Sequence, residues 1–124
     1  MGTMEIGFEF AFDAAHFFAD KPSSHIYRRM HGHSFRVVIG VKGAPDPATG
    51  FIDDFAELES AVGDLRETLD HNLLNDVQGL AIPSLENLAI WVWDRLKPQF
   101  PGLSRVAVHR DSRGQSCVYT GPGE

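Results

Sequence analysis

The sequence is poor in the features that mark secreted, membrane-spanning and nucleic-acid-binding proteins. Its 124 residues include one cysteine, Cys117. An intrachain disulfide is therefore impossible, and we expect a reducing compartment, best matched by the cytoplasm. No apolar run approaches the ~20 residues that a membrane span needs, and no signal-peptide pattern opens the chain.

The 17 acidic residues outnumber the 11 basic ones, giving a formal net charge of -6 without a Lys/Arg run. We expect neither nucleic acid nor a membrane as a partner.

The rest of the composition suits one compact domain. Hydrophobic residues make up 43% of the chain, enough for a core of its own. No internal repeat or low-complexity segment divides the sequence. We therefore expect a single domain over residues 1–124.

Four segments have the pattern of β-strands. Residues 6–12 and 35–41 carry large apolar side chains at every second position, the period of a half-buried strand. Two further strands are predicted over residues 106–111 and 117–120, on either side of a turn at Gly114.

Two helices are predicted between these pairs of strands. Asp54 stands three residues before Glu57, the spacing of a capping box, and apolar residues follow at helical spacing as far as Leu69. A second helix begins at residues 83–84 and ends at Pro98. The order β-β-α-α-β-β predicts an α+β fold, with a four-stranded antiparallel sheet and both helices on one face. The uncovered face and sheet edges favour a homo-oligomer.

Three of the six histidines have the spacing of metal ligands. His31 and His33 are two residues apart, so in extended chain both rings point to the same side. His16 ends the first predicted strand and would join them if the first two strands form an antiparallel hairpin. Three imidazoles with an open fourth position suit a catalytic zinc ion. The His-x-His pattern also occurs by chance in loops, and three imidazoles accept other divalent ions.

An acid and a histidine stand together where the first predicted helix ends. A carboxylate such as Asp70 can orient a neighbouring imidazole, here His71, for general acid-base catalysis. Adjacent residues of a helix do not face each other, however, and a histidine also suits a helix C-terminus through the helix dipole. The sequence leaves both interpretations open.

Five motifs stand in a specific order and spacing: residues 12–16, 31–35, 50–55, 69–76 and 83–89. Together they resemble the 6-pyruvoyl-tetrahydropterin synthase family, and more closely its bacterial 6-carboxy-tetrahydropterin synthase branch in queuosine biosynthesis. The resemblance covers nearly the whole chain.

This resemblance implies a tunnelling fold, in which four-stranded sheets join into a trimeric barrel and two trimers stack as a hexamer with sites between subunits. It implies that His16, His31 and His33 hold zinc and that Asp70 and His71 form part of a proton relay. It also implies 7,8-dihydroneopterin triphosphate as the substrate. The branches of the family tautomerise its side chain, remove its triphosphate or cleave it. No redox cofactor is implied.

The sequence departs from the family at its catalytic thiol. Members usually carry a cysteine four residues before the first histidine of His-Gly-His, where this chain has Tyr27. A tyrosine is a poor base at neutral pH, whereas the nearby His25 would serve if the loop turns it inward. Cys117 lies in a late predicted strand, where a lone cysteine is usually a core residue.

A second departure concerns the substrate contacts. The family places a glutamate in the third strand to bind the pterin, and this chain offers Asp111, which reaches one methylene less far. Asp111 is also an ordinary residue for a turn. The resemblance further implies substrate contacts by Ser84 and Glu86. Arg28 and Arg29 are either contacts for phosphate oxygens or solvated loop charges.

Three functions remain in competition. The first is a zinc-dependent pterin synthase or lyase that acts on 7,8-dihydroneopterin triphosphate. The second is a paralogue without the thiol that cleaves the dihydroneopterin side chain in an aldolase-like reaction of folate synthesis. The third is a pterin- or purine-binding protein without turnover.

Overall fold

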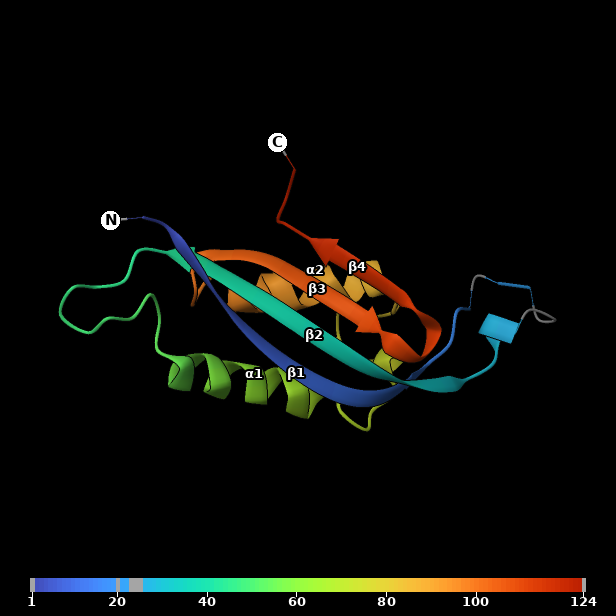
Figure 1. The fold of residues 1–124 in the computed structure, drawn as a ribbon. Helices are drawn as coiled ribbons and strands as arrows, with labels where there is room; N and C mark the ends of the chain where they lie inside the picture. The colour runs from blue at the N-terminus through green and yellow to red at the C-terminus, as the bar shows by residue number, and fades with distance from the viewer. Residues whose placement is uncertain (1, 20, 23–25, 124) are drawn as a thin grey trace.

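The structure, a computed structural model, describes residues 2–19, 21–22 and 26–123. Its sheet contains four antiparallel strands in the order β1-β2-β3-β4 (Figure 1). The elements in chain order are β1 (Met4–His16), β2 (His31–Gly43), α1 (Phe55–Leu69), α2 (Leu85–Leu96), β3 (Leu103–Arg110) and β4 (Gln115–Tyr119). Short 3-10 segments occupy Ile26–Arg28, Leu74–Asp76 and Asp111–Arg113. The predicted β-β-α-α-β-β order is confirmed.

The first two strands form a long hairpin that exceeds the predicted strands at both ends. Pairing continues from Met4 opposite Gly43 to His16 opposite His31. The added residues at the far end of the hairpin are Asp, Ala, His, Gly and Ser rather than large apolar residues, so sequence alternation does not reveal them. Backbone pairing alone extends the sheet there, and it carries the histidines into β1 and β2.

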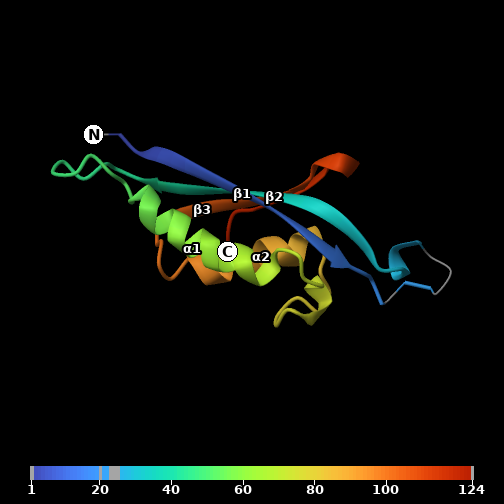
Figure 2. The same ribbon diagram turned by 90° about the horizontal axis from the view of Figure 1, so that it is seen from below.

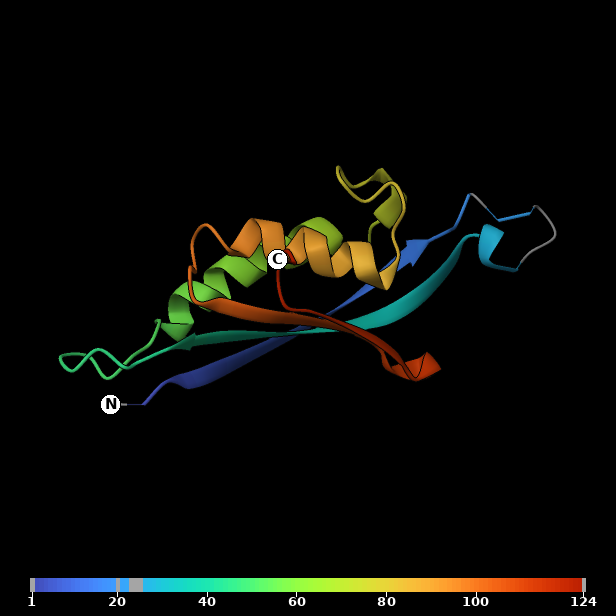
Figure 3. The same cartoon turned by 90° about the horizontal axis from the view of Figure 1, so that it is seen from above.

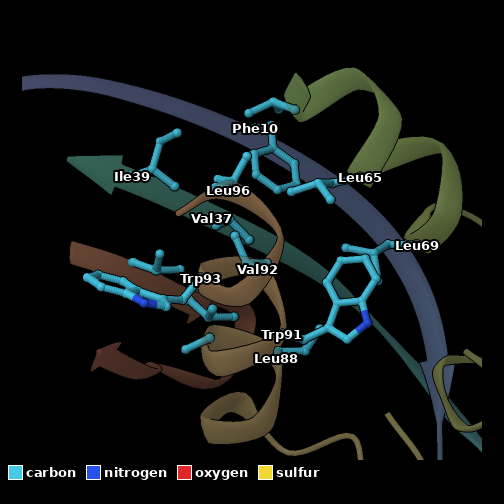
Figure 4. Packing of buried hydrophobic residues seen from close by; sticks show 14 of the residues in the cluster. Phe10, Val37, Ile39, Leu65, Leu69, Leu88, Trp91, Val92, Trp93 and Leu96 are labelled. Atoms are coloured by element: carbon cyan, nitrogen blue, oxygen red, sulfur yellow. The ribbon is translucent and has the colours of Figure 1, made fainter. Parts of the chain in front are cut away.

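Both helices lie on the same face of the sheet, as Figures 2 and 3 show from opposite sides. That face carries the large apolar side chains of β2, from Phe35 to Val41, at 0–1% exposure. Figure 4 shows α2 covering the middle of this layer with Leu88, Val92 and Leu96. The apolar stripe of each helix meets the alternating residues of the strands, which fixes both helices against the sheet.

Polar caps set where the helices begin. Asp54 caps α1 by accepting a hydrogen bond from the amide of Ala56 at 2.8 Å. Ser84 caps α2 by accepting one from the amide of Asn87 at 3.1 Å. These bonds satisfy amides that have no partner within the helix. The predicted starts of both helices are confirmed.

The last two strands differ from prediction at their ends. β3 begins three residues earlier than expected and stops at Arg110, so Asp111 opens the 3-10 turn that follows. β4 begins at Gln115 rather than at Cys117. Gly114 has a φ of 63°, the left-handed conformation that glycine adopts without strain, and it reverses the chain between the two strands.

The outer edge of β1 is covered at one end. The amide of His71 donates to the carbonyl of Asp13 at 2.6 Å, and the amide of Ala15 donates to the carbonyl of Asn72 at 3.1 Å. The chain that leaves α1 is therefore fastened beside the end of β1 that carries His16. Within the described part of the chain, no helix is long and apolar enough to cross a membrane.

The packing of α2 yields a first prediction. Leu88 is fully buried, whereas Ile90 on the same helix is 38% exposed. Replacing Leu88 by Ala should lower the free energy of unfolding by about 2–5 kcal/mol, because the sheet cannot collapse into the cavity. Ile90→Ala should change it by about 0.5 kcal/mol. Urea denaturation followed by circular dichroism measures both, and equal losses would contradict this packing.

Candidate functional site

The structure brings the three predicted metal-ligating histidines together at one end of the hairpin. His16 faces His31 directly in the register of β1 and β2, and His33 follows on the same side of β2. The centroid of the His16 ring lies 4.6 Å from the centroid of the His31 ring and 5.0 Å from that of the His33 ring. One ring nitrogen of each histidine lies within 4.8 Å of those of the other two. The spacing of the three nitrogens suits coordination of a single ion.

Backbone carbonyls determine which ring nitrogen is available. The Nδ1 atom of His16 donates to the carbonyl of Pro83 at 3.1 Å, and Nδ1 of His31 donates to that of Arg29 at 2.6 Å. A carbonyl only accepts, so the neutral rings carry their proton on Nδ1 and keep the Nε2 lone pair. Nε2 of His16 is buried and, among the described residues, has no hydrogen-bond partner. A bound cation would satisfy this lone pair, so the residues fit a metal ion.

Two of these histidines are held in the neutral form. Burial, together with the neighbouring His31 and His33, lowers the pKa of His16 to about 4 despite the bond to Pro83. Burial and the charge of Arg110 lower the pKa of His33 to about 4. Both rings are neutral at pH 7, the state in which an imidazole binds a metal.

A cavity of about 450 Å³ opens beside the histidines. Its walls include His31, His33 and Tyr27, together with Arg110 from the end of β3 and Arg113 from the turn that follows. It therefore combines two of the candidate metal-ligating rings with positive charge and with the hydroxyl groups of Tyr27 and Ser112.

Sequence reasoning missed Arg110. Val106 and Val108 are fully buried under the helices, and by strand alternation Arg110 points to the same side. Its Nε atom is buried and has no hydrogen-bond partner within the part of the chain that the structure describes. The alternation from Val106 onward was the signal that assigns this side to Arg110.

Asp111, the expected pterin anchor, lies apart from this cavity. Its carboxylate binds Arg36 on the helix-free face of the sheet, with oxygens 2.9 Å from Nε and 3.2 Å from Nη2. This bond keeps the pKa of the Asp111 carboxyl below its usual range. The expectation of an acid facing the pocket from the third strand fails in this chain, because strand alternation from the buried Val106 and Val108 turns Arg110 to that side and Asp111 to the other.

The predicted pair of an acid and a histidine, Asp70 and His71, is in contact in the structure. Nδ1 of His71 lies 3.0 Å from Oδ2 of Asp70. Asp70 is extended (φ -69°, ψ 132°), and His71 has a φ of 59°. The chain has therefore left the helix, which removes the objection that adjacent helical residues do not face each other.

Asp70 is itself held in place. Its Oδ1 accepts the amide hydrogen of Asp13 at 2.9 Å, and its Oδ2 lies 3.3 Å from Nη2 of Arg66. The bond from Asp13, with those from His71 and Arg66, lowers the pKa of the Asp70 carboxyl. The carboxylate thus stays ionised and fixes its protonated partner nitrogen.

His33 links the pair to the metal-ligating cluster. A second cavity of about 530 Å³ is lined by His33, Gly32 and Ser34 of β2 and by His71 across the end of β1. Gly32 and His33 border both cavities. The imidazole of His71 and the histidine cluster therefore flank the same short stretch of strand.

Ser84 and Glu86 line a third cavity of about 250 Å³ at the start of α2. This cavity shares Tyr27 and Arg110 with the first one. The Ser84 hydroxyl accepts the capping bond from Asn87, so its acceptor is already engaged. Glu86 is exposed.

Comparison with known proteins assigns the chain to a family. The family model described as 6-pyruvoyl tetrahydropterin synthase matches residues 5–122. The chain belongs to the 6-pyruvoyl tetrahydropterin synthase family. This confirms the resemblance drawn from the five sequence motifs.

Individual members of the family differ in their named activities. The chain is 37% identical over 106 residues to the 6-carboxy-5,6,7,8-tetrahydropterin synthase of Synechocystis sp., covering 81% of each protein. It is 36% identical over 97 residues to the human 6-pyruvoyl tetrahydrobiopterin synthase, a match of 73% of this chain and 66% of that protein. It is also 34% identical over 92 residues to the dihydroneopterin monophosphate aldolase of Pyrococcus furiosus, covering 74% of each.

A solved structure agrees with the fold. The 6-pyruvoyl tetrahydropterin synthase of Caenorhabditis elegans superposes with a TM-score of 0.86 at 22% identity, covering 98% of both chains. The four antiparallel strands and two helices are therefore the architecture of this family.

At the position where family members usually carry a thiol, Tyr27 lies in the short 3-10 segment and borders the first cavity. Its ring centroid is 6.2 Å from that of His31. His25, the other candidate for that position, lies outside the described residues. Cys117 lies in β4, opposite Val108 of β3, and does not line the first cavity. Burial raises the pKa of its thiol. Cys117 is therefore poorly suited to replace the thiol.

The convergence of the three rings yields a second prediction. Protein supplemented with zinc should retain about one ion per chain. His33→Ala should lower zinc affinity by at least about 100-fold, because a direct ligand is lost rather than an outer-shell partner. Metal analysis after dialysis and competition with a chromogenic chelator measure both quantities.

The control is His109→Ala, which removes a β3 histidine that pairs with Arg36 away from the cluster. Its zinc affinity should match that of the unmodified protein. An unmodified protein that stays metal-free would contradict the metal site itself.

Proposed function

We propose that this protein is a zinc-dependent pterin synthase or lyase that acts on the side chain of 7,8-dihydroneopterin triphosphate. Family membership supports a pterin substrate. The observation that carries the proposal is the cluster of His16, His31 and His33 beside the Asp70–His71 pair, with His33 bordering both cavities.

The three histidines would hold the zinc ion through their available ring nitrogens. Zinc bound there would act as a Lewis acid that acidifies a coordinated hydroxyl and stabilises negative charge on oxygen. Neutral rings and the buried Nε2 of His16 favour this assignment. The chain's own contribution is to present three ring lone pairs, and the lowered pKa values of His16 and His33 keep protons from competing for two of them at neutral pH.

His71 would accept and return a proton at a carbon of the substrate side chain. Asp70 holds the proton of His71 on Nδ1, which leaves Nε2 as the accepting atom. Once His71 takes up a proton, the ionised Asp70 stabilises the imidazolium. The 78% exposure of the His71 side chain leaves the ring accessible to a substrate in the second cavity.

Tyr27 takes a different part from the thiol it replaces. Its hydroxyl can donate a hydrogen bond to a substrate oxygen in the first cavity. Proton abstraction then falls to His71 rather than to a base at position 27. This division of roles distinguishes the chain from family members that carry the cysteine.

A homo-oligomer belongs to the same proposal. The helix-free face carries ion pairs of Arg36 with Glu9 and Asp111, and the outer edge of β4 is free of strand partners in the described chain. Pairing between sheet edges of several copies would bury these edges. A trimer or hexamer would then place the sites close to subunit boundaries.

A second candidate function is cleavage of the side chain in an aldolase-like reaction. The 34% identity to the dihydroneopterin monophosphate aldolase of Pyrococcus furiosus and the absence of a cysteine at position 27 favour it. Both functions require the same zinc site and proton relay. They differ in the bond that breaks.

Product analysis separates these functions. Zinc-loaded protein incubated with 7,8-dihydroneopterin triphosphate should yield a carboxy- or pyruvoyl-pterin, identified by mass spectrometry. A hydroxymethyl-pterin would instead establish the aldolase-like reaction. Binding of the compound without any product would overturn turnover and leave a pterin-binding protein.

The proton relay yields a further prediction. His71→Ala should lower kcat by at least about 100-fold, because general acid-base catalysis contributes about 10²–10⁴-fold. Asp70→Asn retains an acceptor for the Asp13 amide, yet loses the charge that stabilises the His71 imidazolium. It should therefore lower kcat as well, and zinc content should be unchanged in both variants.

His109→Ala again serves as the matched histidine control and should retain full turnover. Steady-state kinetics on zinc-saturated proteins provide the comparison. Full activity in His71→Ala would remove His71 from the mechanism.

A further inference from the structure

The first cavity is positively charged in a chain that is acidic as a whole. The formal net charge of the chain is -6. Arg110 and Arg113 nevertheless both line the cavity, and no acidic side chain is among the described residues of its wall. A divalent ion on the histidines would add to this positive charge. Among the described residues, the wall of the cavity therefore carries an excess of positive charge that a bound anion would balance.

The position of Arg110 is fixed by the sheet. It is the last residue of β3 and pairs with Gln115 of β4, so its backbone cannot move away from the cavity without opening the strand pair. Arg113 lies in the adjoining 3-10 turn and is exposed. The two guanidinium groups thus approach the same space from a rigid strand end and from a turn.

Among the described residues, Arg110 has no acidic partner of the kind that a partly buried arginine normally has. Within the described residues it forms no ion pair, and its Nε atom has no hydrogen-bond partner. Burial lowers the pKa of its guanidinium, and Tyr27 and Glu86 offset this effect in part. A charge taken out of water without a partner is unfavourable, so the free protein holds Arg110 in a state that an anion would stabilise.

We propose that Arg110 and Arg113 form an oxyanion-binding site next to the histidine cluster, and that this site selects substrates carrying a phosphate or a carboxylate. The unpaired Nε and the terminal nitrogens of Arg110 give a fork that matches two oxygens of one such group. Arg113 adds a second, solvent-exposed contact.

Arg110 takes the place at which an acid was expected to bind the pterin ring. A guanidinium has no acceptor, so it cannot bind the N–H groups of a pterin edge as a carboxylate would. The anionic group of the substrate lies there instead, and neutral pterins without such a group bind less tightly. This inference rests on the proposed function for the identity of the ring that carries the anion, whereas the two arginines alone define the anion site.

Anion binding without turnover tests the site. Isothermal titration calorimetry with tripolyphosphate, inorganic phosphate and acetate should give saturable binding to the unmodified full-length protein, with or without zinc. Arg110→Gln should weaken binding of the preferred anion at least tenfold, and Arg113→Gln about threefold. Stronger binding of a phosphate probe identifies phosphate as the selected group, and stronger binding of acetate identifies a carboxylate. Either result supports the site.

Controls separate this site from general charge effects and from the metal. Lys42→Gln removes the same charge from an exposed position near the opposite end of β2 and should leave anion affinity unchanged. Arg110→Lys retains the charge without the fork and should bind more weakly than the unmodified protein but more tightly than Arg110→Gln. Circular dichroism confirms folding of each variant, and Arg113→Gln, at an exposed turn, provides a readout that does not depend on the buried position.

Two results would overturn the proposal. One is the absence of saturable binding of every probe. The other is equal anion affinity in Arg110→Gln and Lys42→Gln. Because the titration does not depend on pterin turnover, anion binding that depends on Arg110 in a protein without pterin products would reject the proposed function and retain the site.

Discussion

The site depends on the register of one strand pair. Because β1 and β2 are antiparallel with His16 opposite His31, the rings of both residues and of His33 emerge on the same face of the sheet. A shift of one residue would turn a strand's side chains to the other face and separate the rings. The alternating apolar residues that bury the middle of the hairpin under the helices prevent this shift. The hydrophobic core and the candidate metal site are thus set by the same register.

Two buried nitrogen atoms of the site form no hydrogen bond with the described residues. Nε2 of His16 and Nε of Arg110 are both buried and, in the described residues, unpartnered. Such atoms are rare in folded proteins, because water or a neighbouring group usually satisfies them. One is an acceptor and the other a donor, which suits a cation and an anion respectively. Their closeness is reflected in the effect of the Arg110 charge on His16.

Sequence alone predicted the order of elements and the helix starts well, because periodicity and capping residues are local signals. It placed His16 at the end of the first strand, as the structure has it, but it did not reveal that the second strand begins at His31, since the side chains before Phe35 lack apolar alternation. It also assigned the pocket-facing place to Asp111 instead of Arg110, although the alternation of the buried Val106 and Val108 places Arg110 on that side. The left-handed backbone of His71 had no signal at all, as non-glycine residues adopt this conformation only where tertiary contacts impose it.

The main-chain bonds that join the segment after α1 to β1 have a mechanical consequence. His71 donates to Asp13, and Ala15 donates to Asn72, so this segment is bonded to the strand that carries His16. Thermal displacement of α1 relative to the sheet would therefore bend the chain near Leu69 before it altered the separation between the acid-histidine pair and the three clustered histidine rings. Helix α1 can shift while that separation stays constant, because the bonded segment moves together with β1.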